Sequence, residues 1–162
     1  MLLKSLICED FVNYMKPSMF IGCHSCTFKC DKLSGRQVCQ NGALANAPNI
    51  EVSIDKLVEK YLNNQYTESV VFGGLEPFDD IEHVIEFISK LREKGNTDDV
   101  IIYTGYTENE INEVFSNYVE ELKRQKNIII KYGRFIPDNT SRFDEVLGVN
   151  LHSSNQYAKR IS

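Results

Sequence analysis

Four cysteines near the start of the chain are spaced closely enough to bind a metal ion or a metal cluster. They are Cys23, Cys26, Cys30 and Cys39; Cys8 lies upstream, and no cysteine follows residue 39. Thiolates suit soft or borderline metals, and closing loops of this length costs little entropy. Clustered cysteines in an intracellular chain indicate metal binding rather than disulfide bonds. The alternative is a structural zinc site in which four cysteines fill every coordination position. Zinc ribbons usually carry two C-x2-C pairs, however, and this chain has one.

The cysteine segment resembles the cluster loop of radical S-adenosylmethionine enzymes, whose pattern is C-x3-C-x2-C, commonly with C-x-N at the third cysteine in activating enzymes. Cys26-x3-Cys30 matches the first half and Cys39-Gln40-Asn41 matches the end, with eight residues where the family has two. The resemblance implies a 4Fe-4S cluster held by Cys26, Cys30 and Cys39, in a cluster loop of residues 22–48. One iron would then be free to bind S-adenosylmethionine.

Two other ligand sets stay open. A second register would use Cys23, Cys26 and Cys30, because Gly22-Cys23 is similar to the Gly-Cys that often opens the family motif. If all four cysteines bound, the site would be closed and the radical chemistry would be excluded.

A glycine pair followed by an acidic residue forms a second candidate site. The segment Gly73-Gly74-Leu75-Glu76-Pro77 resembles the family's Gly-Gly-Glu-Pro turn with one inserted leucine. Glycines allow a backbone to approach a ligand closely, and a carboxylate can pair with a ligand ammonium group. The resemblance predicts that Gly73, Gly74 and Glu76 bind the cofactor; the alternative is an ordinary turn with a solvated Glu76.

A third candidate segment, Tyr103-Thr104-Gly105, resembles the Tyr-Thr-Gly-Tyr turn of the activating enzymes, which lines the cofactor pocket. We therefore expect these three residues to contact S-adenosylmethionine. The alternative is a core Tyr103 followed by a glycine turn. Near the end of the chain, Gly133-Arg134-Phe135 and Ser153-Ser154-Asn155-Gln156 are similar to the closing elements of the same family.

Taken together, these segments make the chain similar to one branch of the radical S-adenosylmethionine superfamily, the anaerobic ribonucleotide reductase activating proteins. The resemblance implies an oxidoreductase that generates a 5′-deoxyadenosyl radical and activates a glycyl-radical enzyme. It also implies a one-electron donor such as a flavodoxin or ferredoxin. Two alternatives stay open: a free-standing radical enzyme with another substrate, and a noncatalytic iron-sulfur or zinc adaptor.

The elements that must position these residues follow from hydrophobic periodicity. Apolar, β-branched runs predict buried parallel strands at Ser18–Ile21, Ser69–Phe72, Val100–Tyr103 and Asn127–Lys131. Helical spacing predicts helices at Ile54–Leu62, at Asp80–Leu91, and from Thr107 to about Leu122, the last with a Thr107/Glu110 capping box. We expect a single α/β domain over residues 1–162, an open partial (β/α) barrel with a mainly parallel sheet. Loops that follow the strands should converge at one edge.

Composition excludes several function classes. The 162 residues carry a net charge of −5 with interspersed signs, which disfavours a nucleic-acid partner. No stretch reaches the length of a membrane span, and the first residues lack the apolar core of a signal peptide. We therefore expect a cytoplasmic protein without membrane contact.

Overall fold

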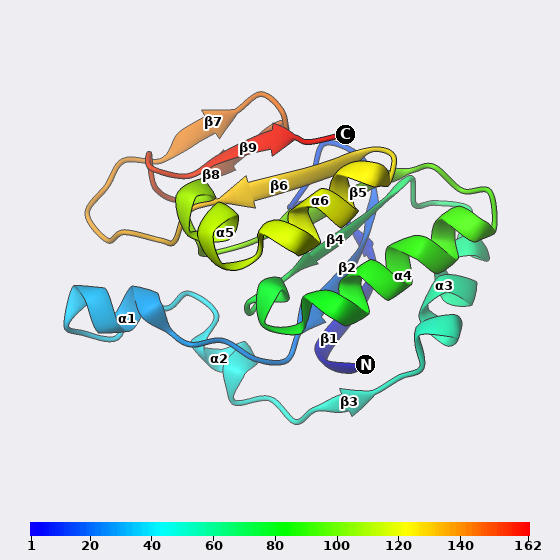
Figure 1. Cartoon of the computed structure of the whole chain (residues 1–162). Coiled ribbons are helices and arrows are strands. Elements are labelled where there is room, and N and C mark those ends of the chain that lie inside the picture. The colour runs from blue at the N-terminus through cyan, green and yellow to red at the C-terminus, as the bar shows by residue number, and fades with distance from the viewer.

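A computed structural model describes residues 1–162, the whole chain. The strands are β1 (Leu2–Asp10), β2 (Ser18–Cys23), β3 (Ile50–Glu51), β4 (Ser69–Gly73), β5 (Asp99–Tyr103), β6 (Ile128–Tyr132), β7 (Arg142–Asp144), β8 (Val149–Leu151) and β9 (Tyr157–Arg160). The helical segments are α1 (Lys29–Ser34), α2 (Gly42–Ala45), α3 (Ile54–Leu62), the 3-10 turn η1 (Pro77–Asp80), α4 (Ile81–Glu93), α5 (Glu108–Val114) and α6 (Ser116–Arg124). Figure 1 shows their arrangement.

The four predicted strands form the centre of a seven-stranded sheet, in the order β3-β1-β2-β4-β5-β6-β9. β2, β4, β5 and β6 run parallel, whereas β1, β3 and β9 pair antiparallel with their neighbours. The expectation of a single α/β domain is confirmed, but the expectation of a mainly parallel sheet is wrong. The sheet is mixed, and no barrel is shown. A short connection between β1 and β2 allows only a hairpin, which makes that pair antiparallel. Burial along β1 is irregular, so its sequence pattern is weak.

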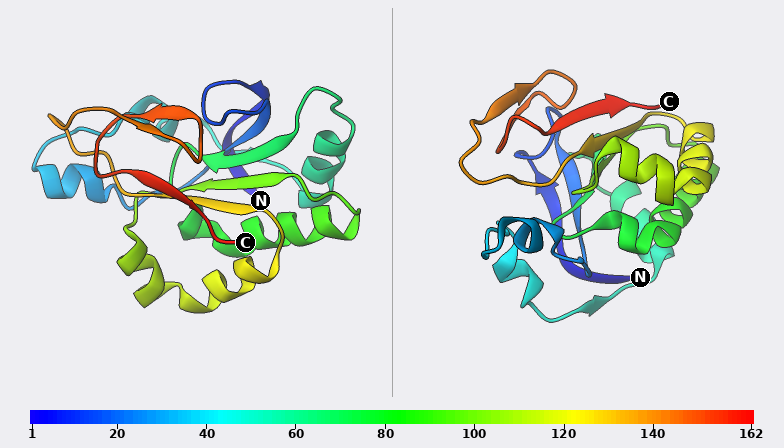
Figure 2. Two further views of the ribbon diagram at one scale, coloured as in Figure 1. Left: turned by 90° about the horizontal axis from the view of Figure 1, so that it is seen from above. Right: turned by 60° about the vertical axis from the view of Figure 1, so that its left-hand side comes forward.

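Helices cover one face of the sheet, and irregular segments with the β7–β8 hairpin cover the other (Figure 2). Side chains alternate between these faces along each strand. Phe72, Ile102 and Ile130 belong to the helix-side core. The alternate positions belong to a second, smaller core, closed by Tyr14, Leu147 and Leu151; they are Val71, Ile101 and Ile129. Burial on both faces agrees with the uncharged, β-branched strands that the sequence predicted.

Helix boundaries follow the predicted caps closely. The helix predicted at Ile54–Leu62 is α3, and the Ser53 hydroxyl accepts a hydrogen bond from the Lys56 N–H at its start. Thr107 and Glu110 form the predicted capping box of α5. The third predicted helix is divided, however, because Phe115 leaves helical geometry between α5 and α6. Its ring packs against the rings of Phe78 and Tyr106 at centroid distances of 5.2 and 5.4 Å.

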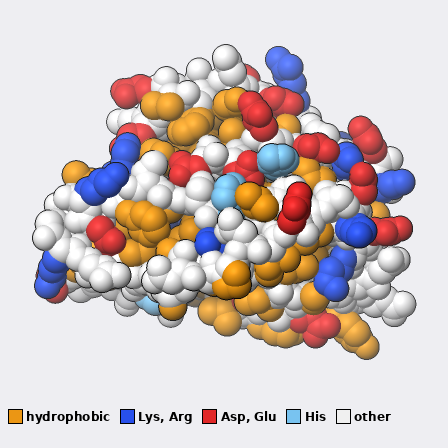
Figure 3. Space-filling model, turned by 90° about the horizontal axis from the view of Figure 1, so that it is seen from below, with side chains coloured by type: hydrophobic (Ala, Val, Ile, Leu, Met, Phe, Trp, Pro, Cys, Tyr) orange, Lys and Arg blue, Asp and Glu red, His pale blue; other side chains and the backbone are white.

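Acidic and basic side chains are interspersed on the face of the molecule that Figure 3 shows. None of the helices has both the length and the apolar character needed to cross a membrane.

A buried carboxylate anchors the amino-terminal end of β5. Asp99 accepts hydrogen bonds from the Tyr14 hydroxyl at 2.9 Å, the Lys16 ammonium at 2.7 Å and the Arg160 guanidinium at 2.8 Å. Burial by itself would raise the pKa of Asp99, but these hydrogen bonds outweigh it and lower the pKa below its usual value. Asp99 therefore joins β5 to β9 and to the β1–β2 connection.

We expect Asp99→Asn to lower the free energy of unfolding by about 1–3 kcal/mol at neutral pH, because two cations lose a buried charged partner. A carboxyl whose pKa is lowered by folding stabilises above its unfolded pKa and loses that contribution as pH falls. The difference from wild type should therefore shrink below about pH 4. Urea unfolding followed by circular dichroism measures both effects. Asp55→Asn is the control, because the exposed Asp55–Lys90 pair should contribute about 0.5 kcal/mol or less. Equal losses in both variants would contradict the interpretation.

Candidate functional site

A cavity of about 390 Å³ lies at the carboxyl ends of the parallel strands. It is lined by the cysteine loop after β2 and by the turns after β4, β5 and β6. The β8 strand closes part of the opposite side. These loops converge because carboxyl ends of parallel strands share one edge of the sheet, as the sequence predicted.

Eight of the nine predicted site residues line this cavity: Cys26, Cys30, Cys39, Gly74, Glu76, Tyr103, Thr104 and Gly105. Gly73 is the exception. A Cβ on Gly73 would lie 3.3 Å from both the Phe20 ring and the Tyr103 Cβ, so a side chain at this position would crowd both residues. Gly74 has a φ of +76°, in the left-handed region that favours glycine, and this conformation turns the chain away from β4.

Cys23 lies on the opposite side of the sheet from the cavity. β2 continues two residues beyond the predicted end at Ile21, and Met19, Ile21 and Cys23 alternate onto the helix-side core. The Cys23 thiol is fully buried there, and burial raises its pKa far above the usual value. This placement disfavours the register and the closed zinc site that include Cys23. The ligand set of Cys26, Cys30 and Cys39 stays a prediction.

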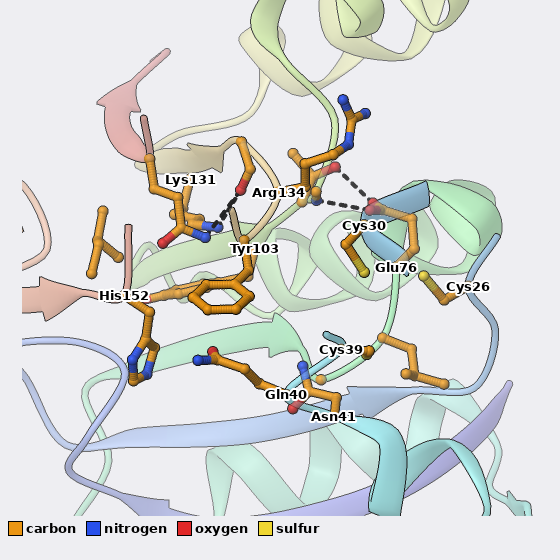
Figure 4. A pocket seen from close by; sticks show the side chains of 18 of the residues that line it. Cys26, Cys30, Cys39, Gln40, Asn41, Glu76, Tyr103, Lys131, Arg134 and His152 are labelled. Atoms are coloured by element: carbon orange, nitrogen blue, oxygen red, sulfur yellow. Dashed lines mark hydrogen bonds between the residues drawn. The ribbon is translucent and has the colours of Figure 1, made fainter. Parts of the chain in front are cut away.

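Cys26, Cys30 and Cys39 lie toward one end of the cavity, and His152 lies at the other end (Figure 4). Burial raises the pKa of Cys26 to about 11, and the Cys30 thiol contributes to this rise. Burial also raises the pKa of Cys30, with further contributions from Cys39 and Asp31. The Cys30 thiol is thus close to both the Cys26 thiol and the Cys39 thiol. No three side chains of Cys, His, Asp or Glu are arranged to hold a single metal ion. Three thiols facing one cavity suit an iron-sulfur cluster, whose usual protein ligands are thiolates.

Glu76 joins the three loops around the cavity. Its Oε1 accepts hydrogen bonds from the Thr104 hydroxyl at 2.7 Å and the Phe78 N–H at 3.1 Å, and its Oε2 accepts one from the Gly105 N–H at 2.8 Å. Its own N–H donates to the Ser25 carbonyl at 2.8 Å. Burial raises the pKa of Glu76 to about 7, although these hydrogen bonds oppose the rise. A carboxylate offers about four acceptor positions, so Oε2 keeps one for a ligand.

The turn after β5 is fixed by its own polar contacts. Thr104 is buried, and its hydroxyl accepts a hydrogen bond from the Tyr106 N–H at 3.0 Å. The Tyr103 hydroxyl donates to the Asn13 carbonyl at 2.5 Å, which leaves its ring against the cavity. Thr104 and Gly105 therefore donate hydrogen bonds to Glu76. Tyr103 is the residue of the three whose ring lines the cavity.

Residues 16–157, most of the chain, match a family model described as a 4Fe-4S single cluster domain. The chain belongs to this family. It is an iron-sulfur cluster-binding domain, and the cysteine loop lies inside the matched residues. No curated protein and no solved structure matches the chain.

Lys131 is a residue of the 4Fe-4S domain's cavity that the sequence analysis missed. It is buried at the end of β6, and its ammonium donates to the Gly133 carbonyl at 2.7 Å. Burial lowers the pKa of Lys131 to about 8, against the opposing effect of Glu76. The sequence pattern that could have indicated Lys131 is a single charged residue within the apolar run of β6. His152 and Asn150 also line the cavity, and no pattern in the sequence indicated them.

The terminal Ser-x-Asn-Gln segment of the 4Fe-4S domain holds the turn after β6. The Gln156 side-chain amide donates to the Gly133 carbonyl at 3.2 Å, and the Asn155 amide donates to the Arg134 carbonyl at 2.9 Å. Arg134 in turn pairs with Glu110 at 2.7 Å, and the pKa of Glu110 is lowered to about 2 because the Thr107 N–H and Arg134 outweigh burial. The family resemblance included Asn155 and Gln156 but gave them no physical role. In the structure their side chains fix the turn after β6 by hydrogen bonds to its carbonyl groups.

We expect Cys26→Ser, Cys30→Ser and Cys39→Ser each to lose most bound iron after anaerobic reconstitution of the 4Fe-4S domain. Cys23→Ala is the matched control. It should keep its iron and lose about 1 kcal/mol of stability, because a buried thiol is removed from the core. Iron per chain and the visible absorption of the cluster are the measurements. A folded Cys23→Ala variant without iron would contradict the predicted ligand set.

Proposed function

We propose that this 4Fe-4S domain is a radical S-adenosylmethionine enzyme. The observation that carries the proposal is that one cavity joins the thiols of Cys26, Cys30 and Cys39 to the turns at Gly74–Glu76 and Tyr103–Gly105. These are the segments that resemble the cluster-binding and cofactor-binding motifs of that superfamily. Their common cavity supports the resemblance independently of their order in the sequence.

When bound, the cluster supplies the electron for reductive cleavage of S-adenosylmethionine to methionine and a 5′-deoxyadenosyl radical. The chain's own residues bind and orient the cofactor. The carboxylate and ammonium groups of S-adenosylmethionine need partners of opposite charge. Lys131 offers an ammonium with donors beyond its single hydrogen bond, and Glu76 offers the remaining acceptor on Oε2. Tyr103 and Phe20 offer ring faces for the less polar parts of the ligand.

Exclusion of water from the cavity is the second contribution of the chain. The β7–β8 hairpin and the β1–β2 connection cover the face of the sheet next to the cavity, through the core that contains Tyr14, Leu147 and Leu151. A reactive intermediate is protected from side reactions when its site is closed to solvent. This cover comes from the chain itself, and it leaves the rim with exposed apolar side chains.

We propose that a protein partner completes this cover. Val12 lines the cavity and is 74% exposed, and its neighbour Phe11 is 67% exposed. Exposed apolar side chains at a cavity rim are typical of a surface that another molecule covers. The resemblance to activating enzymes favours a glycyl-radical enzyme as this partner, with a flavodoxin or ferredoxin as the electron donor. The radical would remove a hydrogen atom from a glycine of the partner.

We expect the reduced, reconstituted protein to convert S-adenosylmethionine to 5′-deoxyadenosine and methionine. Lys131→Met should lower this rate at least about 10-fold through weaker cofactor binding, because a buried charged hydrogen-bond donor is removed. Lys159→Met is the matched control, because Lys159 lies on the neighbouring strand with its ammonium paired to Glu108 and outside the cavity. Chromatography of the nucleoside product measures the rate. Equal rates in both variants would contradict the assignment of Lys131.

Electron spin resonance of a mixture with a glycyl-radical enzyme tests the partner. A glycine-centred radical signal that requires this chain, S-adenosylmethionine and the three cysteines is the expected result. Formation of 5′-deoxyadenosine without any radical on the partner would favour a free-standing enzyme instead. One tightly bound zinc ion per chain and no 5′-deoxyadenosine would favour a noncatalytic adaptor.

A further inference from the structure

The eight residues between Cys30 and Cys39 form a small protruding unit, visible in Figure 1 as α1 and the segment after it. Cys30 lies in the first turn of α1, and Gly35 ends the helix in the left-handed conformation, with a φ of +64°. The chain then reverses and returns to Cys39. α1 has six residues and none of them is buried. A helix this short is not stable by itself, so another interaction must fix where Cys39 returns.

One carboxylate makes that connection. Asp31 Oδ1 accepts hydrogen bonds from the backbone N–H groups of Val38 at 2.7 Å and Cys39 at 2.8 Å. The Cys30 sulfur lies 3.8 Å from the same oxygen. Asp31 thus contacts both cysteines that flank the long gap. Arg36 of this unit also forms an ion pair with Asp138, but both side chains are exposed and the pair should contribute little.

We propose that Asp31 is a positioning residue for the cluster, which closes the eight-residue segment and holds Cys39 beside Cys30. The inference rests on the ligand set Cys26, Cys30 and Cys39 proposed above. It explains how a gap of eight residues can replace a gap of two. The chain closes the extra length into a loop whose two ends meet at one oxygen atom.

The position of Asp31 has a second, electrostatic consequence. A carboxylate beside two cluster ligands disfavours the addition of an electron, because net charge and hydrogen bonding around the sulfurs set the reduction potential. Asparagine keeps an acceptor oxygen at the same position and removes the charge. Alanine removes both. The two substitutions therefore separate the hydrogen bonds that position Cys39 from the effect of the negative charge.

The experiment compares Asp31→Ala and Asp31→Asn with wild type after anaerobic reconstitution. Asp31→Ala should lose its cluster to a chelator at least about 10-fold faster, the size of effect common for residues that orient metal ligands. Asp31→Asn should keep the cluster and show a more positive reduction potential. Asp138→Ala is the matched control and should behave as wild type, because it removes an exposed carboxylate that contacts the same unit through Arg36. Iron content, chelator kinetics and redox titration are the measurements.

Two results would overturn the inference. One is an Asp31→Ala variant that keeps its cluster as long as wild type does. The other is an Asp31→Asn variant that loses it as fast as Asp31→Ala. Cys39→Ser separates this failure from failure of the ligand set. If Cys39→Ser keeps its iron, the proposed ligand set fails; if it loses iron and Asp31→Ala does not, only the role of Asp31 fails.

Discussion

Glu76 carries the interaction on which the geometry of the cavity depends. Its side chain and its backbone N–H join the turn after β4 to the turn after β5 and to the cysteine loop. Burying a carboxylate costs free energy unless hydrogen bonds replace the lost water, and three donors do so here. The balance is close, since burial still leaves the pKa of Glu76 near 7. The three segments around the cavity therefore share one residue as their common contact.

The four parallel strands at the centre of the mixed sheet explain why these segments lie near one another. β2, β4, β5 and β6 pair in register, so Gly22 lies beside Gly73, and Tyr103 lies beside Lys131. Each strand reaches the same edge, and each following loop begins there. The alternation of side chains then decides which residues face the cavity and which enter the helix-side core. Lys131 faces the cavity side, where a buried amine with a lowered pKa is typical of a functional position.

The cysteine loop combines a family property with a feature of this chain. Membership in the 4Fe-4S single cluster domain family accounts for the cluster. The spacing of the cysteines departs from the motif that they resemble, and the structure shows the extra residues folded back through Asp31. Lys29 also contacts the ring of Tyr106 at 4.9 Å, which attaches α1 to the turn after β5. The loop is therefore held at its base while α1 itself lies exposed.

The sequence by itself determined the central strands, the main helices with their caps and the set of loops at the site. These follow from local periodicity and from capping residues such as Ser53 and Thr107, which act within a few positions along the chain. Only the tertiary structure decided that β1 and β9 flank the sheet, that Cys23 faces the core and that Lys131 lines the cavity. Strand pairing and the exact end of β2 set these features, and both depend on partners far away in sequence. The hydrogen bonds that Asp31 accepts from Val38 and Cys39 could not be predicted from the sequence for a related reason. Nearly every residue has a backbone N–H, so the types of the donor residues do not indicate such bonds.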